Sequence, residues 1–111
     1  MKTMAAVTYG IDEKNPFTVK EIELDEPKDD EVMVHLVAAG LCHSDWNFVS
    51  GAQWIGYWPM VLGHEGAGVV EKVGKDVTKV KPGDHVVLSY IPTCAKCEWC
   101  LMGKSRLCTD G

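Results

Sequence analysis

The sequence predicts a mostly β domain, an antiparallel barrel or sandwich with short helical turns, joined to a loop lobe organised around a metal ion. Two observations carry this prediction. Short segments rich in β-branched and apolar residues are separated by turn residues, and four cysteines crowd into residues 94–108. A third observation narrows the class. No G-x-G-x-x-G motif follows a predicted strand, so we expect no dinucleotide-binding unit in this chain.

Three strands are predicted in the first part of the chain. Residues 3–9 form a short apolar segment with β-branched and aromatic members, and residues 18–24 alternate with a period of two, which is typical of a half-buried strand. Residues 31–39 form a longer run that ends before a glycine. Residues 12–16 and 27–30 combine proline with aspartate or asparagine, which predicts turns between these strands.

The middle of the chain predicts one helical turn and two further strands. Residues 45–49 fit a helical turn that a glycine ends, and residues 67–74 predict a strand interrupted by glycines. Residues 81–84, with the sequence Lys-Pro-Gly-Asp, are a strong turn signal. This turn leads into residues 85–90, which predict a buried strand.

Composition and charge limit the possible functions. The chain has 111 residues, 46% of them hydrophobic, which suits one globular domain with a real core. A formal net charge of -5 without a basic stripe argues against nucleic acids and anionic membranes as partners. No apolar run approaches the roughly 20 residues of a membrane span, and the N-terminal segment lacks the apolar stretch of a signal peptide. We therefore expect a cytoplasmic protein.

The clustered cysteines are the strongest chemical signal in the sequence. Cys94, Cys97, Cys100 and Cys108 follow the pattern C-x-x-C-x-x-C-x7-C. Each C-x-x-C turn can present two sulfurs to one ion, and the longer gap lets the fourth cysteine close a tetrahedron. Zinc suits four thiolates, and this closed set leaves no open position for water or substrate. Residues 92–110 are therefore predicted to form a lobe with a structural zinc site.

Three other interpretations of the cysteines fit less well. The bacterial iron–sulfur run places its fourth cysteine after three residues and follows it with proline, whereas here the gap is seven residues and Thr109 follows. A disulfide framework fits poorly with five cysteines and no secretion signal. Four reduced thiols without a metal fit poorly with a polar stretch that contains glycine.

Three motifs outside the lobe carry a family resemblance. They are G-L-C-H-S-D at residues 40–45, G-H-E-G-A-G at residues 63–68 and P-G-D-H-V at residues 82–86. Together with the cysteine lobe, in the same order and spacing, they make the chain resemble the zinc-dependent medium-chain alcohol dehydrogenases over residues 5–111. The resemblance implies that residues 1–111 are the GroES-like β barrel of the N-terminal catalytic domain, incomplete and without a Rossmann domain.

The resemblance also implies a second, catalytic zinc site. Cys42 and His64 would be metal ligands, and Glu65 would lie beside the metal as an alternate ligand. Ser44 would bind the substrate hydroxyl and relay its proton, and Asp45 would orient His64. Residue types alone suit zinc, yet without the resemblance a buried structural cysteine and a capped histidine would be the better interpretation. A helix N-cap is the alternative role for Ser44.

Several further side chains receive expected roles. By the resemblance, His43 would lie near the pyrophosphate of the cofactor, and the alternative is an exposed polar residue. Tyr90 and Trp54 would line the substrate cleft, with core packing as an equally good interpretation. His35 and His85 are interpreted as structural residues.

The sequence departs from the family in two respects. The family's catalytic zinc takes a further cysteine well downstream, and the five cysteines here are already assigned. The nicotinamide-binding domain, which would bring NAD(P), is missing as well. We therefore expect the lobe to hold zinc and the Cys42–His64 site to bind metal weakly or to stay empty.

The expected function is that of an N-terminal part of a zinc-dependent alcohol dehydrogenase, inactive alone. The full enzyme would interconvert small primary alcohols and aldehydes with a nicotinamide cofactor as hydride acceptor. The alternative is a stand-alone GroES-like zinc-binding module without catalysis. A bare apolar face where the Rossmann domain would pack predicts self-association. A co-chaperonin would share the barrel but would have no use for the zinc motifs.

Overall fold

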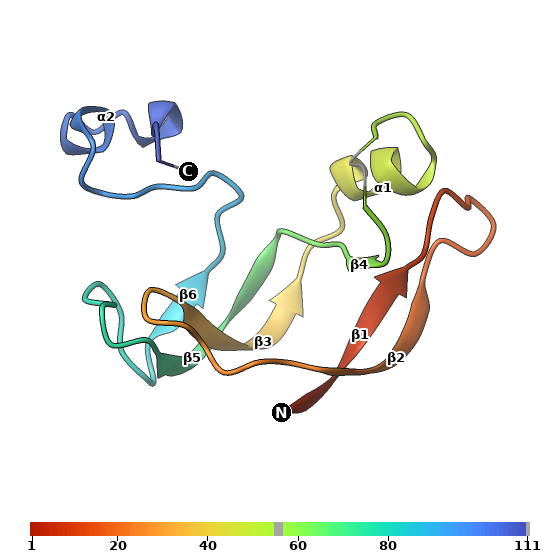
Figure 1. Cartoon of the computed structure of the whole chain (residues 1–111), viewed down its shortest axis with the longest axis horizontal. Coiled ribbons are helices and arrows are strands. Elements are labelled where there is room, and N and C mark those ends of the chain that lie inside the picture. Colours follow the sequence, from red (N-terminus) through yellow and green to blue (C-terminus); the bar gives the residue numbers. More distant parts are fainter. Residues whose placement is uncertain (55–56, 111) are drawn as a thin grey trace.

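The computed structural model describes residues 1–54 and 57–110; position 111, the last residue of the predicted domain, lies outside them. The chain is mostly strand, with short helices in the connections (Figure 1). The elements, in chain order, are β1 (Lys2–Thr8), β2 (Thr18–Glu23), β3 (Val32–Ala39), α1 (His43–Val49), β4 (Met60–Val61), β5 (Gly66–Val73), β6 (His85–Val87), α2 (Glu98–Leu101) and the 3-10 helix η1 (Ser105–Leu107).

The strands of the described residues form two antiparallel sheets. One sheet has the order β2-β1-β4 and the other has the order β3-β5-β6, so β1 and β5 are the central strands. The two sheets lie beside each other (Figure 1), and no strand pairing among the described residues joins them into one ring. The predicted antiparallel β fold is confirmed. Its barrel is open among the described residues, because the edge strands of the two sheets do not pair with each other.

The predicted segments match four of the observed strands closely. The ends of β1, β2, β3 and β5 each lie within one residue of the prediction. The predicted turns are held by local hydrogen bonds. The Asp12 carboxylate accepts the N–H groups of Lys14 and Asn15, and the N–H of Asp84 donates to the carbonyl of Lys81. The two-residue strand β4 and the short helix α2 were not predicted, because neither is long enough to show a period.

The buried core is smaller than the composition suggests. Val7, Met33, Val49 and Val70 are the apolar side chains that the described part of the chain buries almost completely. The prediction of a buried strand at residues 85–90 is wrong. β6 has three residues at the edge of its sheet, and Val87 is 80% exposed. β2 is likewise mostly exposed, although its alternation predicts a half-buried strand.

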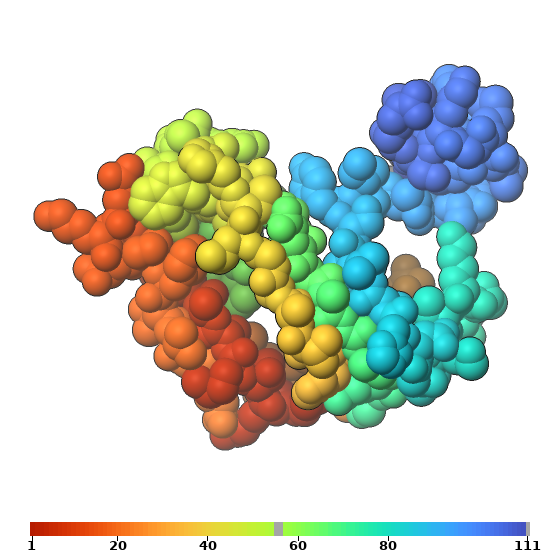
Figure 2. All heavy atoms as spheres, turned by 180° about the vertical axis from the view of Figure 1, so that it is seen from behind, coloured from red at the N-terminus to blue at the C-terminus, as the bar shows by residue number. Residues whose placement is uncertain are grey.

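Two regions of this fold hold the cysteines. α1 follows directly after β3, and β5 begins beside the end of β3 (Figure 1). The lobe, residues 92–110, stands apart from the sheets at the end of the chain (Figures 1 and 2). A cleft of about 980 Å³ lies between the lobe and the turns at residues 29–30 and 76–80. Among the helices of residues 1–54 and 57–110, none has the length and apolar character that crossing a membrane requires.

Candidate metal centres

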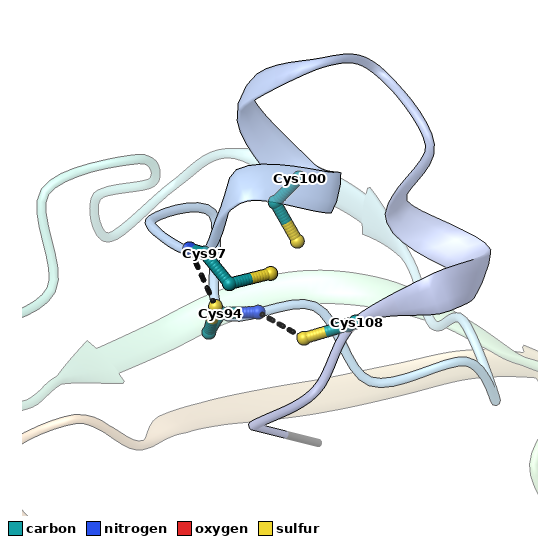
Figure 3. A group of neighbouring side chains, drawn as sticks. All are labelled: Cys94, Cys97, Cys100 and Cys108. Carbon is teal, nitrogen blue, oxygen red and sulfur yellow. Dashed lines mark hydrogen bonds between the residues drawn. The ribbon is translucent and has the colours of Figure 1, made fainter.

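The four lobe cysteines converge on one point from consecutive turns. Cys94 precedes a residue with left-handed backbone, Ala95, with φ 59°. Cys97 is the N-cap of α2, Cys100 lies within α2, and Cys108 follows η1. Their sulfurs point toward one another (Figure 3) and all lie within 4.8 Å of one another. The predicted ligand set is thus brought together by local turns alone.

Backbone N–H groups around the lobe sulfurs favour the charged thiolate form. The N–H of Cys97 donates to Cys94 Sγ at 3.2 Å, and the N–H of Cys94 donates to Cys108 Sγ at 3.3 Å (Figure 3). Hydrogen bonds from backbone N–H groups, that of Thr109 first, lower the pKa of Cys97 to about 6. Burial raises the pKa of Cys100 to about 11. The cluster therefore contains at least one thiol that ionises readily and one that needs a cation beside it.

This donor set fits a zinc ion. All five cysteines of the chain are free thiols, so the disulfide interpretation finds no support. A tetrahedron with Zn–S bonds of about 2.3 Å has S···S edges of about 3.8 Å, which lie inside the 4.8 Å limit of this cluster. Four thiolates would satisfy such an ion completely, which corresponds to a structural site.

A second group of possible metal ligands lies where β3 and β5 meet. The β3–β5 ladder continues past its last strand pair, because the N–H of Gly40 donates to the carbonyl of Glu65 at 2.7 Å. This pairing brings Cys42, the N-cap of α1, next to the segment that enters β5. Cys42 Sγ, a ring nitrogen of His64 and a carboxylate oxygen of Glu65 lie within 4.8 Å of one another.

The surroundings of this group set the charge of its members. His64 Nδ1 lies 3.4 Å from Asp45 Oδ1, and Cys42 Sγ lies 3.5 Å from Ser44 Oγ. The contact with Cys42 and then the charge of Asp45 raise the pKa of His64. Hydrogen bonds from Ser44 and then from His64 lower the pKa of the Cys42 thiol. The Tyr90 ring lies 5.5 Å from the His64 ring.

The structure also shows where the other predicted residues lie and how exposed they are. His43, the first residue of α1, is exposed and is not a member of the ligand group. Trp54 and Tyr90 are each 77% exposed, so core packing is the wrong interpretation for both in this chain. The N-cap interpretation of Ser44 is also wrong, because α1 begins at His43 and Cys42 is the cap.

Two other interpretations are changed by the structure. His35 and His85 lie in strands as expected, but both are exposed, and His35 Nδ1 lies 3.5 Å from Glu71 Oε1 on the sheet surface. Gly40 was missed as a site residue. Its place as the first residue of the G-L-C-H-S-D motif was the available signal, but only the folded structure shows that it contacts Glu65.

The fold and the two ligand groups indicate a metal-binding β domain. A comparison of the chain with known protein families identifies which one. Residues 28–111 match the alcohol dehydrogenase GroES-like domain, so the chain belongs to this family. The resemblance seen in the sequence motifs is confirmed.

Individual relatives are alcohol dehydrogenases. The chain is 51% identical over all 111 residues to an NDMA-dependent alcohol dehydrogenase of Amycolatopsis methanolica and 50% identical over 109 residues, 98% of the chain, to an S-(hydroxymethyl)glutathione dehydrogenase of Paracoccus denitrificans. It spans 29% of the first protein and 28% of the second. It is also similar to a cobalt- and zinc-bound thermostable alcohol dehydrogenase of Pyrobaculum aerophilum. In that comparison the TM-score is 0.83 and the identity 33%, covering 98% of this chain and 33% of the other.

Proposed function

We propose that this chain supplies the zinc-binding part of a zinc-dependent alcohol dehydrogenase that uses NAD(P). The convergence of Cys42, His64 and Glu65, outside the closed cysteine lobe, is the observation that carries the proposal. A site with so few protein ligands keeps positions open, which is what distinguishes a catalytic zinc from a structural one. The chain is almost equally similar to two relatives that act on different substrates, so the proposal names only small alcohols and aldehydes as the substrate class.

The Cys42–His64–Glu65 group is called the open site, and the residues around it have separate roles in this proposal. A bound zinc would act as a Lewis acid and lower the pKa of an alcohol hydroxyl. Ser44, 3.5 Å from Cys42 Sγ, lies where it would accept the proton of such a hydroxyl. Asp45 would hold His64 through Nδ1, which leaves Nε2 for the metal. Tyr90, beside the His64 ring, would form one wall for the substrate.

In this proposal the lobe holds a structural zinc ion, and activity requires a nicotinamide-binding domain in addition to this chain. The lobe zinc would hold residues 92–110 in shape without taking part in the reaction. His43 and Trp54 would meet the cofactor and the substrate only once a nicotinamide-binding domain is in place. Without that domain the chain would be inactive. Its five free thiols suit a reducing compartment such as the cytoplasm.

Exposed apolar side chains near the open site favour an interaction with another domain or another protein chain at this surface. Large apolar side chains near the open site, among them Leu41, Val87 and Tyr90, are at least 77% exposed. Exposed apolar patches of this kind mark interaction surfaces. The proposal therefore expects the isolated chain to self-associate, which analytical ultracentrifugation over a range of concentrations would measure.

A chimera tests the proposed function directly. This chain would replace the matching segment of the 51%-identical Amycolatopsis methanolica relative, and alcohol oxidation would be followed with metal content. We expect an active chimera that loses at least a hundredfold in activity on Cys42→Ser or His64→Ala and keeps its lobe metal. Glu71→Ala is the matched control, because Glu71 is an exposed carboxylate of β5 outside the site. A chimera whose activity survives both substitutions would refute the proposal.

A further inference from the structure

Gly40 is a residue of the open site whose lack of a side chain has a specific reason. It lies between β3 and Cys42, and its N–H is bonded to the Glu65 carbonyl. Its φ is outside the left-handed region that favours glycine. The backbone conformation at this position therefore does not require glycine, and the reason for glycine is steric.

The space that a side chain would take at position 40 is filled by Glu65. A β-carbon added to Gly40 would overlap Glu65 Oε2 and would lie 3.0 Å from its Cβ and 3.2 Å from its Cδ. In this place the Glu65 carboxylate has an oxygen within 4.8 Å of Cys42 Sγ and of a ring nitrogen of His64. The absence of a side chain at position 40 thus coincides with the presence of a third ligand atom.

A side chain at position 40 would displace the carboxylate by turning the Glu65 side chain, with a shift of a few tenths of an ångström where the added carbon meets Glu65 Cβ. The overlapping atom is the far end of a flexible side chain, and Glu65 is exposed. A shallow pocket of about 420 Å³, lined in part by Gly40, Glu65, Val87 and Leu88, lies beside it. The carboxylate therefore has room to turn away from the other two ligands.

We propose that Gly40 is a positioning residue that keeps the Glu65 carboxylate against Cys42 and His64, where it is the third ligand that this chain offers to the open metal site. This inference rests on the proposed function, because it needs a metal at that site. It makes Gly40 act through Glu65 alone, so the two residues must be coupled. A glycine needed for a reason other than the Glu65 side chain would show no such coupling.

A double-substitution cycle on metal affinity tests the coupling. The lobe would first be filled with one equivalent of zinc, and Co²⁺ binding to the open site would then be titrated by its absorption. We expect Gly40→Ala and Glu65→Ala each to weaken Co²⁺ binding about tenfold, which is the scale of losing a ligand-positioning group. The combined variant should be no weaker than Glu65→Ala alone. Glu71→Ala, on the same sheet, should leave binding unchanged.

The possible results separate this inference from the proposed function. Equal binding by Gly40→Ala and the unsubstituted chain, or a hundredfold additive loss in the combined variant, overturns the role of Gly40 alone. A chain that binds no Co²⁺ sensitive to Cys42→Ser overturns the proposed site and the inference with it. If Gly40→Ala fails to fold by circular dichroism, recovery of folding in the combined variant supports the inference. If the combined variant also fails to fold, the inference is wrong.

Discussion

The lobe and the open site gather their ligands in opposite ways. The lobe takes four sulfurs from residues 94–108, and backbone N–H groups of the same turns bond to those sulfurs. The open site joins Cys42 to His64 and Glu65 across the β3–β5 ladder. A site built from neighbouring residues can form with its metal whatever the rest of the fold does. A site built across a ladder depends on the register of two strands.

The two regions also differ in how completely they surround an ion. Four thiolates close a tetrahedron, so the lobe has no position for a substrate. The open site has one thiolate, one imidazole and one carboxylate within reach among the described residues. In the proposed function, the lobe therefore holds structure and the open site carries the chemistry, although the lobe has the more conspicuous sequence motif.

The largest expected effect is the loss of the lobe metal. Cys97→Ser removes the thiol with the pKa of about 6, and three thiolates cannot close the site. We expect the chain to lose one equivalent of tightly held metal, and the lobe to become sensitive to trypsin at its exposed Lys104 and Arg106. Metal analysis and mass spectrometry of the digest would measure both. Amide signals of β3 and β5 should be preserved; their loss would contradict the independence of the lobe.

Removal of a ligand from the open site should weaken metal binding there and leave the lobe metal in place. His64→Ala leaves one thiolate and one carboxylate, so we expect at least a tenfold loss of Co²⁺ affinity at this site. The lobe metal should remain fully bound. A titration with the lobe already filled with zinc would measure the change. Loss of metal from the lobe in this variant would show that the two regions are coupled.

Destabilising the β3-β5-β6 sheet should weaken the open site and leave the lobe unchanged. Val70 is 2% exposed in the central strand β5, and Val70→Ala would remove two buried methyl groups and leave a cavity. We expect the sheet to lose about 2 kcal/mol of unfolding free energy, measured by urea denaturation. Metal affinity should fall at the open site and stay constant at the lobe. An unchanged denaturation midpoint would indicate that β5 is not part of the core.

The smallest expected effect comes from Asp45. Its charge helps to raise the pKa of His64 above the ordinary 6.5, after the larger effect of Cys42. In the chain with an empty open site, this interaction stabilises the fold fully below about pH 6.5 and is lost as the pH rises through the raised pKa. Asp45→Asn should move the NMR titration of His64 to lower pH.

The same substitution should also weaken metal binding, because Asp45 fixes the orientation of His64. We expect a loss of about tenfold in Co²⁺ affinity. The affinity of the unsubstituted site should rise with pH, because the metal takes neutral imidazole. A His64 titration that does not change in Asp45→Asn would exclude the contact between the two side chains.

The sequence predicts the local features of this molecule better than the distant ones. Apolar and β-branched runs between turn residues give β1, β2, β3 and β5 within one residue, and cysteine spacing gives the lobe, because both depend on neighbours along the chain. The pairing of Cys42 with His64 could be expected only from family resemblance. It depends on the β3–β5 ladder, which contains two register shifts that no single-strand pattern predicts.

Exposure was the least predictable property. Residues 85–90 are apolar enough for a buried strand, yet Val87, Leu88 and Tyr90 are all exposed. An apolar run indicates that a segment will be covered but does not indicate what covers it. The role of Gly40 was hidden for a related reason, because the contact that explains it is made with a residue 25 positions later in the chain.

A Co²⁺ titration of the reduced, metal-free chain tests the central claim most directly. The claim is that the lobe is a closed metal site that forms by itself, while the Cys42–His64 group is an open and weaker site. The first equivalent should bind tightly with the intense sulfur-to-cobalt absorption of a tetrathiolate. That signal should survive Cys42→Ser and disappear in Cys97→Ser. A first equivalent that is lost in Cys42→Ser and kept in Cys97→Ser would contradict the claim.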